Sequence, residues 1–374
     1  MKVFILAQCL TGGGAERVAA TLADGLIGRG HKVYLFFDDT KRITYHTAPD
    51  VNLVPYKPNK YHLPKKIRRL LTAGFISRHI RKERPDAVIG CKDTYAFIAK
   101  LAVLLSGLHI PVIFSDHNAL ERPADVPMPW NERFYKFYFS RYCDIYTVLT
   151  HADKKVAEEK RLKNAVVMHN PLCILPCKGL PAKSNTILAV GRLDAWYCKG
   201  LDILIKAWSQ IANRYPDWKL QIVGSGSENS EKEVRLMIHD AGLESRISLC
   251  PFTQNIIDYY RDSSVFVLSS RYEAFGLVLT EAMSQGCACV ACDFKGRQKE
   301  IVTDGVDGLI CEPGNVEMLS TRVARLIDDD TLRHSIQQAA VKSVTRFSPV
   351  SYAERWEELL VAASEQKKKK FQLS

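Results

Sequence analysis

The sequence of 374 residues lacks a long, uninterrupted apolar run. Its longest apolar region, residues 97–114, is broken by Lys100, His109 and Pro111. A membrane-spanning helix needs about 20 consecutive apolar residues, so we expect no span here. The opening segment MKVFILAQCL has only a short apolar stretch and leads into glycines without a small-residue cleavage site. It predicts a first β-strand and not a secretory signal.

The sequence also lacks a second Cys-x-x-Cys motif that could pair with the one at 289–292. The segment CACVACD around it reads as a small, buried strand, and a structural metal site needs about four ligands. Asp328-Asp329-Asp330 contains an Asp-x-Asp pattern, but it follows a late helix and predicts a surface turn. We therefore predict no metal. Eleven cysteines without a signal segment indicate free thiols and a cytoplasmic location.

Acidic residues are scarce in the first half of the chain. Residues 1–178 carry 28 Lys and Arg against 16 Asp and Glu, whereas residues 179–374 carry 24 against 25. Within the first half, residues 57–84 hold ten basic side chains and one acidic side chain. Such a surface favours phosphates, either of nucleic acid or of anionic lipid.

Short runs rich in Val and Ile alternate with helical segments of ten to fifteen residues, and this alternation starts again near residue 185. The pattern predicts an α/β fold with two Rossmann-like, doubly wound domains facing a central cleft. We expect an N-terminal acceptor domain over 1–175, a linker over 176–184 and a C-terminal nucleotide-sugar domain over 185–347. A helix over 348–365 should pack back on the first domain, followed by a basic tail over 366–374.

Two motifs in the first half follow predicted strands. Gly12-Gly13-Gly14-Ala15-Glu16-Arg17 opens a helix, where backbone N–H groups can approach a phosphate or a sugar. Arg17 stands where a dinucleotide fingerprint needs a third glycine, so a plain tight turn is an equal alternative. Ser115-Asp116-His117-Asn118 follows an apolar strand, and His117 could hydrogen-bond a sugar hydroxyl or share a proton there. The alternative is a capped turn with a solvated histidine.

The second half carries the more specific signals. Arg192 follows the predicted first strand of this half, and Lys199-Gly200 opens the next helix, an arrangement suited to two phosphates. Glu273 and Glu281 bracket a predicted loop-to-helix junction at Leu277. Apolar neighbours argue against a merely solvated helix face, so we expect Glu273 to accept from donor-sugar hydroxyls and Glu281 from ribose hydroxyls.

With these motifs in this order, the chain resembles the family-4 retaining glycosyltransferases of the GT-B fold. The resemblance spans nearly the whole chain. It rests on GGGAERV at Gly12, SDHN at Ser115, VGRLD and KGLDILIKAW from Val190, IVGSGSE at Ile222, SSRYEAFGLVLTEAM at Ser269 and DGVDGLICEPGN at Asp304.

The resemblance implies that Arg192 and Lys199 hold the diphosphate of a UDP-sugar, Glu281 the ribose and Glu273 the donor sugar. It places His117 near the transferring sugar, which makes His117, Glu273, Arg192 and Lys199 the predicted catalytic set. It also implies retention, hence an α-linked product, and neither a metal nor a further cofactor. The remaining predicted donor contacts are Gly13, Gly14, Gly224, Phe252, Phe275, Gly276 and Leu277.

Two features depart from or add to the family pattern. Many relatives carry Gly-Pro where this chain has Lys295-Gly296-Arg297-Gln298, which leaves the contacts of this loop open. Trp196 and Tyr197 lie just before Lys199. They either line the acceptor site or pack against other residues of their own domain.

The basic segment 57–84 interleaves cations with apolar residues, as in a helix at a lipid interface, although Gly74 weakens the helix. A solvated helix packed on its own domain is the alternative. The aromatic segment from Trp130 to Phe139 predicts core packing, with an aromatic belt at the membrane as the alternative. We expect transfer from a UDP-hexose or UDP-N-acetylhexosamine to a lipid-linked oligosaccharide or surface polysaccharide precursor, on the inner face of the cell membrane.

Two other functions compete with this prediction. A nucleotide-sugar epimerase can share the fold, but it should need neither the Glu273 and Glu281 pair nor a basic, lipid-facing patch. A nucleic-acid-binding protein would explain the net positive charge of the first half. No known nucleic-acid-binding module is visible in the sequence, however, and such a function would leave the motifs of the second half without a role. We therefore expect no nucleic-acid partner.

Overall fold

The computed structural model describes residues 1–39, 43–57 and 63–372. Of the predicted basic segment 57–84, residues 58–62 and thus Lys60 lie outside the described residues. The chain forms two compact units, which we describe separately. The first unit comprises Met1–Cys173 and Phe347–Ser374, and the second comprises Ile174–Arg346.

The first unit is built on a parallel sheet that has seven strands within the described residues, in the order β3-β2-β1-β4-β5-β6-β7. Its strands are rich in Val, Ile and Phe and are mostly buried on both faces, as parallel sheets require. They are β1 (Lys2–Leu6), β2 (Lys32–Asp38), β3 (Asn52–Tyr56), β4 (Ala87–Cys91), β5 (Val112–Ser115), β6 (Ile145–Val148) and β7 (Ala165–Val167).

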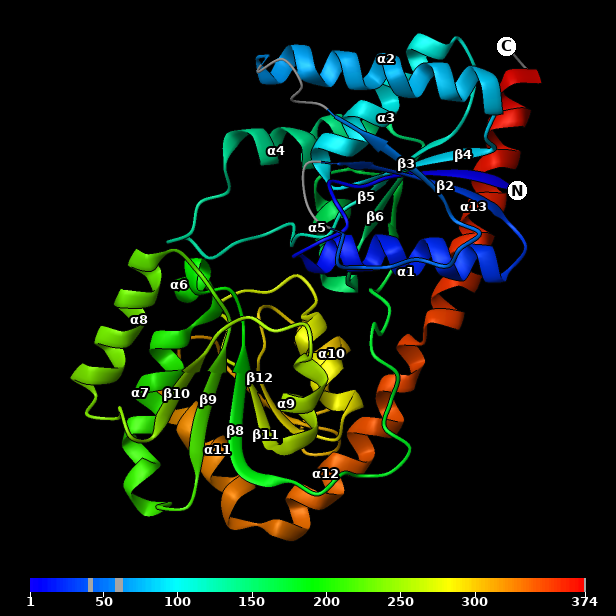
Figure 1. Cartoon of the computed structure of the whole chain (residues 1–374). Helices are drawn as coiled ribbons and strands as arrows, with labels where there is room; N and C mark the ends of the chain where they lie inside the picture. The colour runs from blue at the N-terminus through cyan, green and yellow to red at the C-terminus, as the bar shows by residue number, and fades with distance from the viewer. Residues whose placement is uncertain (40–42, 58–62, 373–374) are drawn as a thin grey trace. The chain divides into compact units, whose positions relative to one another are not determined.

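Helices cover both faces of this sheet (Figure 1). Alternate strand residues such as Phe4 and Leu6 pack under α2 and α3 in one apolar cluster. On the opposite face, α1 packs along α13, and Gly25 of α1 leaves room for Ala353 of α13. The helices are α1 (Gly14–Gly28), α2 (Lys65–Glu83), α3 (Asp93–Ser106), α4 (Trp130–Phe137), α5 (His151–Glu159) and α13 (Pro349–Gln372).

Helix α13 runs to Gln372 and does not end at residue 365 as the sequence suggested. Glu, Gln and Lys are good helix formers, and no Gly or Pro interrupts this stretch. Lys367 also donates to Asp144 at 2.6 Å. The segment expected to be a solvated tail therefore begins as an extension of the helix.

The second unit repeats this topology around a parallel sheet of six strands within the described residues, in the order β10-β9-β8-β11-β12-β13. Its strands are β8 (Ser184–Val190), β9 (Lys219–Val223), β10 (Ile247–Cys250), β11 (Ser263–Leu268), β12 (Ala288–Cys292) and β13 (Leu309–Cys311). Strand β12 is the CACVACD segment, and its cysteines are buried in the sheet. The prediction of a small, buried strand at this position is confirmed.

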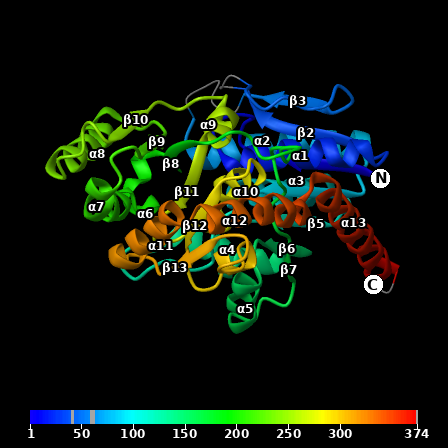
Figure 2. The ribbon, with the colours of Figure 1, turned by 90° about the horizontal axis from the view of Figure 1, so that it is seen from below.

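Two groups of helices enclose the second sheet (Figure 2). Helices α7, α8 and α11 pack on one face in a large apolar cluster, and α9 and α10 lie on the other, whereas α12 contacts both α11 and α10. These helices are α7 (Leu201–Ile211), α8 (Glu228–Asp240), α9 (Ile256–Asp262), α10 (Leu277–Ser284), α11 (Val316–Asp328) and α12 (Asp330–Ser343). The prediction of two doubly wound, Rossmann-like α/β domains is confirmed.

The strand order reverses direction once in each sheet. In the first unit the reversal lies between β1 and β4, and in the second between β8 and β11. The helices that follow such a pair leave toward opposite faces, so the loops at the carboxyl ends of the two strands separate there and leave room for a ligand. Among the described residues, no helix is both long and apolar enough to cross a membrane.

Gly90 of β4 shows how closely helix and sheet approach in the first unit. A Cβ atom at Gly90 would lie 2.3 Å from the Ala96 Cα of α3, whereas one at Gly74 of α2 would meet no atom within 4 Å. We expect Gly90→Ala to destabilise the protein by roughly 1–3 kcal/mol through overpacking. Gly74→Ala should stabilise it by about 0.5–1 kcal/mol, because alanine favours a helix over the unfolded chain. Urea denaturation measures both, and equal effects would contradict this account.

Candidate functional site

The reversal point of the second unit brings together two of the predicted site residues. Lys199 lies in the short helix α6 (Trp196–Lys199), in the connection that follows β8, and Glu273 lies in the loop that follows β11. The Lys199 ammonium donates to Glu273 Oε2 at 2.6 Å, and Ser270 Oγ donates to the same oxygen at 3.3 Å. Both charged side chains are partly exposed. The site is therefore an accessible ion pair at the carboxyl edge of the sheet.

Glycines make this edge compact. The Gly224 backbone lies against Gly191, so that a Cβ atom at Gly224 would lie 1.8 Å from the Gly191 carbonyl oxygen. Gly200 has a φ of +61°, and a Cβ atom there would lie 2.0 Å from the Ser269 carbonyl oxygen. Ser269 Oγ in turn donates to the Lys199 carbonyl at 2.8 Å. These contacts fix the backbone that carries Lys199.

Arg192 directly follows the β8-Gly191 turn and its side chain is exposed. Within the described chain no hydrogen bond or ion pair of its guanidinium is observed. Its neighbour Asp194 accepts from the Ser227 backbone N–H at 2.7 Å, which lowers the pKa of Asp194 and anchors the start of α8. Arg192 thus lies on a fixed loop with a guanidinium directed to solvent.

Helix α10 begins at Leu277, as the sequence predicted. Gly276 has a φ of +94°, which turns the chain into the helix, and Phe275 is buried beneath it. Glu281 lies in the second turn, is almost fully buried and accepts from the Tyr260 hydroxyl at 3.1 Å. The first N–H groups of a helix have no partner inside it, so the 275–277 turn can donate to an anion.

The loop that departs from the family pattern packs onto this turn. Gln298 is fully buried, and its side-chain amide donates to the Phe275 carbonyl at 3.5 Å while accepting from the Phe294 backbone N–H at 2.9 Å. Arg297 is also fully buried and lies over the Phe294 ring at 5.0 Å. Gln298 in this loop therefore holds the backbone at Phe275, directly before the first turn of α10.

The two aromatic residues before Lys199 form contacts within the second unit. The Trp196 indole N–H donates to Glu233 at 2.6 Å, and the Tyr197 ring lies 3.9 Å from the Arg271 guanidinium. Arg271 also forms two hydrogen bonds to Asp202, at 2.7 and 2.8 Å. Of the two alternatives, the described contacts favour packing. Phe252, by contrast, is exposed at the end of β10.

In the first unit, the reversal point carries Glu16 and Lys92, which sequence reasoning did not single out as site residues. The Lys92 ammonium contacts the buried Glu16 carboxylate, and a Cβ atom at Gly13 would meet Glu16 Oε2 at 2.1 Å. A carboxylate thus lies beside the Gly13-Gly14 turn, which favours sugar hydroxyls over phosphate there. Lys92 has a φ of +71°, a strained backbone conformation for a residue with a Cβ atom.

His117 follows β5, next to this ion pair. Its Nε2 lies 3.3 Å from Ser115 Oγ, and burial lowers the pKa of the imidazole to about 4. His117 is therefore neutral near pH 7 and can both donate and accept one hydrogen bond. The solvated histidine that was the alternative would keep its ordinary pKa.

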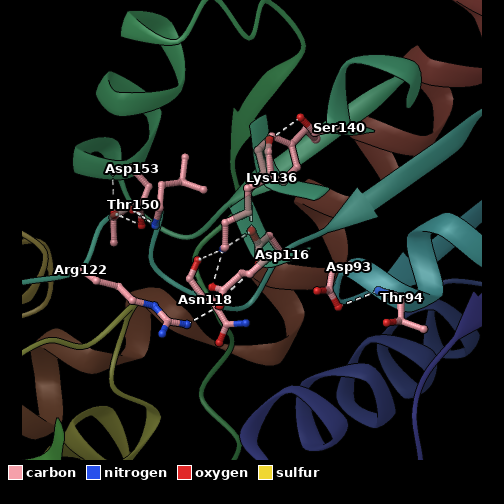
Figure 3. A network of polar contacts seen from close by, with 12 residues as sticks. Asp93, Thr94, Asp116, Asn118, Arg122, Lys136, Ser140, Thr150 and Asp153 are labelled. Atoms are coloured by element: carbon pink, nitrogen blue, oxygen red, sulfur yellow. Dashed lines mark hydrogen bonds and ion pairs between the residues drawn. The ribbon is translucent and has the colours of Figure 1, made fainter. Parts of the chain in front are cut away.

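A buried ion pair holds the turn that carries His117 (Figure 3). Lys136 of α4 is 1% exposed and donates to Asp116 Oδ2 at 2.6 Å and to the Asn118 carbonyl at 3.1 Å. Asp116 also accepts from the Tyr146 hydroxyl at 2.7 Å and from the Asn118 backbone N–H at 3.0 Å. These hydrogen bonds of Asp116 and Lys136 hold the backbone of the turn in place on both sides of His117.

The aromatic segment from Trp130 to Phe139 only partly enters the core. Tyr135 and Phe139 are buried, but Trp130, Phe134 and Tyr138 are exposed and their rings stack along one side of the segment. The prediction of core packing was wrong for these three residues. Their spacing of four residues places them together on a single face, which α3 does not cover.

The fold of the two units is that of the GT-B glycosyltransferases. The crystal structure of Anabaena Alr3699/HepE in complex with UDP and glucose superposes with a TM-score of 0.79, covering 96% of this chain and 99% of that one at 20% sequence identity. At this identity the likeness establishes the fold alone.

Family models establish the membership. One described as Glycosyltransferase Family 4 matches residues 12–172, and one described as Glycosyl transferases group 1 matches residues 176–343. Together they account for most of the chain, which therefore belongs to this glycosyltransferase family. This membership confirms the resemblance and favours the glycosyltransferase prediction over the epimerase and nucleic-acid alternatives.

Two bacterial relatives match this chain over nearly their whole length. The amylovoran biosynthesis glycosyltransferase AmsD of Erwinia amylovora is 28% identical, over 96% of this chain and 99% of its own length. A Campylobacter jejuni enzyme is 25% identical, over 96% and 98% of the two chains. That enzyme is named GalNAc-alpha-(1->4)-GalNAc-alpha-(1->3)-diNAcBac-PP-undecaprenol alpha-1,4-N-acetyl-D-galactosaminyltransferase.

The buried pair at Asp116 gives a stability prediction. Lys136→Met should cost about 3–5 kcal/mol in the free energy of unfolding, because Asp116 would remain buried without its counter-ion. Lys154→Met removes the exposed pair between Lys154 and Glu158 and should cost at most about 1 kcal/mol. Urea denaturation of both variants is the measurement. Similar losses in the two would mean that the buried pair does not support the turn.

The lowered pKa of His117 gives a pH prediction. In the unfolded chain this histidine takes up a proton near pH 6.5, whereas the folded protein resists protonation until about pH 4. Its contribution to stability is therefore lost as the pH falls from about 6.5 to 4. NMR titration should give a midpoint near 4, and His117→Gln should lose less stability over this interval than wild type. A midpoint near 6.5 would contradict the assignment.

Proposed function

We propose that this glycosyltransferase transfers a sugar from a UDP-hexose or UDP-N-acetylhexosamine, with retention, to a lipid-linked oligosaccharide or surface polysaccharide precursor. The observation that carries the proposal is the Lys199–Glu273 pair at the reversal point of the second unit. A cation and a carboxylate 2.6 Å apart match the two parts of a sugar diphosphate, one anionic and one rich in hydroxyl groups.

The diphosphate binds between Arg192 and Lys199, with the N–H groups of the 275–277 turn. Glu273 accepts from hydroxyls of the donor sugar. Glu281 accepts from the ribose hydroxyls, since the two oxygens of a carboxylate can together accept several hydrogen bonds besides the one from Tyr260. Gly224 and Gly191 allow the close backbone contact that positions the loop beside Lys199. Phe252, two residues after β10, offers an exposed aromatic ring to the nucleotide.

The chemistry needs stabilisation of the leaving group. As the bond between the anomeric carbon and the diphosphate oxygen breaks, negative charge develops on UDP, and the fixed cations of Arg192 and Lys199 stabilise it without a metal. Family resemblance supports retention, so an α-linked donor gives an α-linked product. The neutral His117 orients a sugar hydroxyl by hydrogen bonding, with Gly14 and the Glu16–Lys92 pair beside it in the first unit.

The acceptor class is inferred from relatives and from surface chemistry. The Erwinia relative is named for amylovoran biosynthesis, and the Campylobacter relative is named for a glycan on undecaprenyl diphosphate. In this chain, α2 exposes Ile67, Leu70 and Leu71 among its basic residues. We propose that this face binds the inner, anionic surface of the cell membrane as a peripheral contact.

Donor binding tests the proposal. Lys199→Ala should weaken UDP binding by roughly 10- to 100-fold, because a charged hydrogen bond is worth about 1.5–3 kcal/mol. Glu273→Ala should bind UDP but release no UDP from a UDP-sugar in the presence of membrane extract. Calorimetry and a panel of UDP-hexoses and UDP-N-acetylhexosamines provide the two readouts, and NMR of the product reports the anomeric configuration.

Lys206→Ala is the matched control, since Lys206 is exposed on α7 of the same unit and away from the ion pair. It should behave like wild type in both assays. Unchanged UDP affinity in Lys199→Ala, or a β-linked product from an α-linked donor, would overturn the proposed donor site or the proposed retention, respectively.

A further inference from the structure

The first unit contains a pocket that none of the predicted site residues lines. It has a volume of about 230 Å³ and lies at the carboxyl edge of the sheet, next to Gln8 after β1, Asp38 at the end of β2 and Tyr56 at the end of β3. The first turns of α2 and α3 complete it. Ligands of open α/β sheets bind at this edge.

Cations dominate the wall that α2 provides. Lys65, Arg68 and Arg69 line the pocket, and Asp38 is the acidic residue among its lining residues. The Arg69 guanidinium is held in place, because it donates to the Tyr135 hydroxyl at 2.9 Å and to Thr94 Oγ1 at 3.3 Å. The pocket therefore presents a positive wall in which Arg69 is held in place by its contacts within the first unit.

Two buried polar atoms of this pocket lack the partners that their burial calls for. Arg68 Nε is inaccessible to solvent and has no hydrogen-bond acceptor among the described residues. The Tyr56 hydroxyl is buried as well and has no hydrogen-bond partner by distance and angle within the described residues, although Tyr95 and Asp38 lie near it. Buried donors are normally satisfied, and because Arg68 and Tyr56 both line this pocket, their unpaired donors point to an acceptor that a ligand supplies.

We propose that this pocket binds a phosphate group of the acceptor, as found in a glycosyl phosphate or diphosphate carried on an apolar chain. The inference rests on the proposed function and deepens it by naming the anionic part of the acceptor. Arg68 and Lys65 neutralise the phosphate, Tyr56 donates to it, and Asp38 accepts from a hydroxyl of the adjoining sugar. Ile67, Leu70 and Leu71 are exposed on the same two turns of α2, so the apolar chain leaves the pocket along them.

The test measures binding of inorganic pyrophosphate to the full-length protein by calorimetry. Saturating UDP is present throughout, because pyrophosphate would otherwise also bind near Lys199. We expect Arg68→Gln to weaken pyrophosphate binding at least tenfold and Tyr56→Phe to weaken it severalfold. Arg133→Gln, an identical change at an exposed arginine of the same unit that does not line the pocket, should leave it unchanged. Equal affinities in Arg68→Gln and wild type would overturn the proposal.

Vesicle sedimentation separates the acceptor phosphate from a general lipid headgroup. Wild type should bind phosphatidylcholine vesicles containing a polyprenyl diphosphate more tightly than vesicles of equal charge containing phosphatidylglycerol. Arg68→Gln should lose this preference and keep its binding to phosphatidylglycerol. Equal losses on both vesicles would mean that Arg68 serves only general charge attraction, and would also overturn the proposal.

Donor binding keeps this inference distinct from the function on which it rests. If UDP binding depends on Lys199 but pyrophosphate binding is the same in Arg68→Gln and wild type, the proposed phosphate pocket is wrong and the proposed donor site stands. If UDP does not bind while pyrophosphate binding depends on Arg68, the pocket stands and the donor site fails. In a transfer assay, Arg68→Gln should raise KM for the acceptor at least tenfold with kcat and the donor KM unchanged.

Discussion

The reversal of strand order in each sheet is the constraint on which the site depends. Parallel neighbours such as β8 and β11 end at one edge, and the helices that follow them diverge toward opposite faces, so the two loops separate and leave a crevice between them. Lys199 and Glu273 meet at this point in the second unit, and Lys92 and Glu16 meet at the equivalent point in the first. Each unit thus places an ion pair where its backbone leaves room for a ligand.

Rigidity at these points comes from polar groups that are buried and satisfied. Asp116 and Lys136 hold the turn before His117, and Gln298 holds the Phe275 backbone before α10. Neither arrangement touches solvent to any extent, so water does not compete with its hydrogen bonds. A sugar hydroxyl or a phosphate then meets groups that need little reorganisation, which is the condition for effective electrostatic stabilisation.

Much of this could be predicted from the sequence, because local signals and topology agree. The helix start at Leu277, the buried strand over Ala288–Cys292 and the doubly wound fold follow from short-range patterns. The exposed stack of Trp130, Phe134 and Tyr138 could not be predicted, since aromatic content does not reveal which face a neighbour covers. The role of Lys92 depends on a positive φ and on a partner 76 residues away, neither of which a motif displays. The sugar and phosphate roles of the site residues stay predictions.

In the contact between Lys199 and Glu273, the Glu273 carboxylate occupies the position beside the Lys199 ammonium that we propose for the donor diphosphate. In the donor site that we propose, donor entry is an exchange of counter-ions in which the diphosphate binds the Lys199 ammonium and Glu273 is released toward the sugar. A sugar without a diphosphate, or a diphosphate without a sugar, completes only half of this exchange, so the same contact serves to discriminate the intact donor from either fragment.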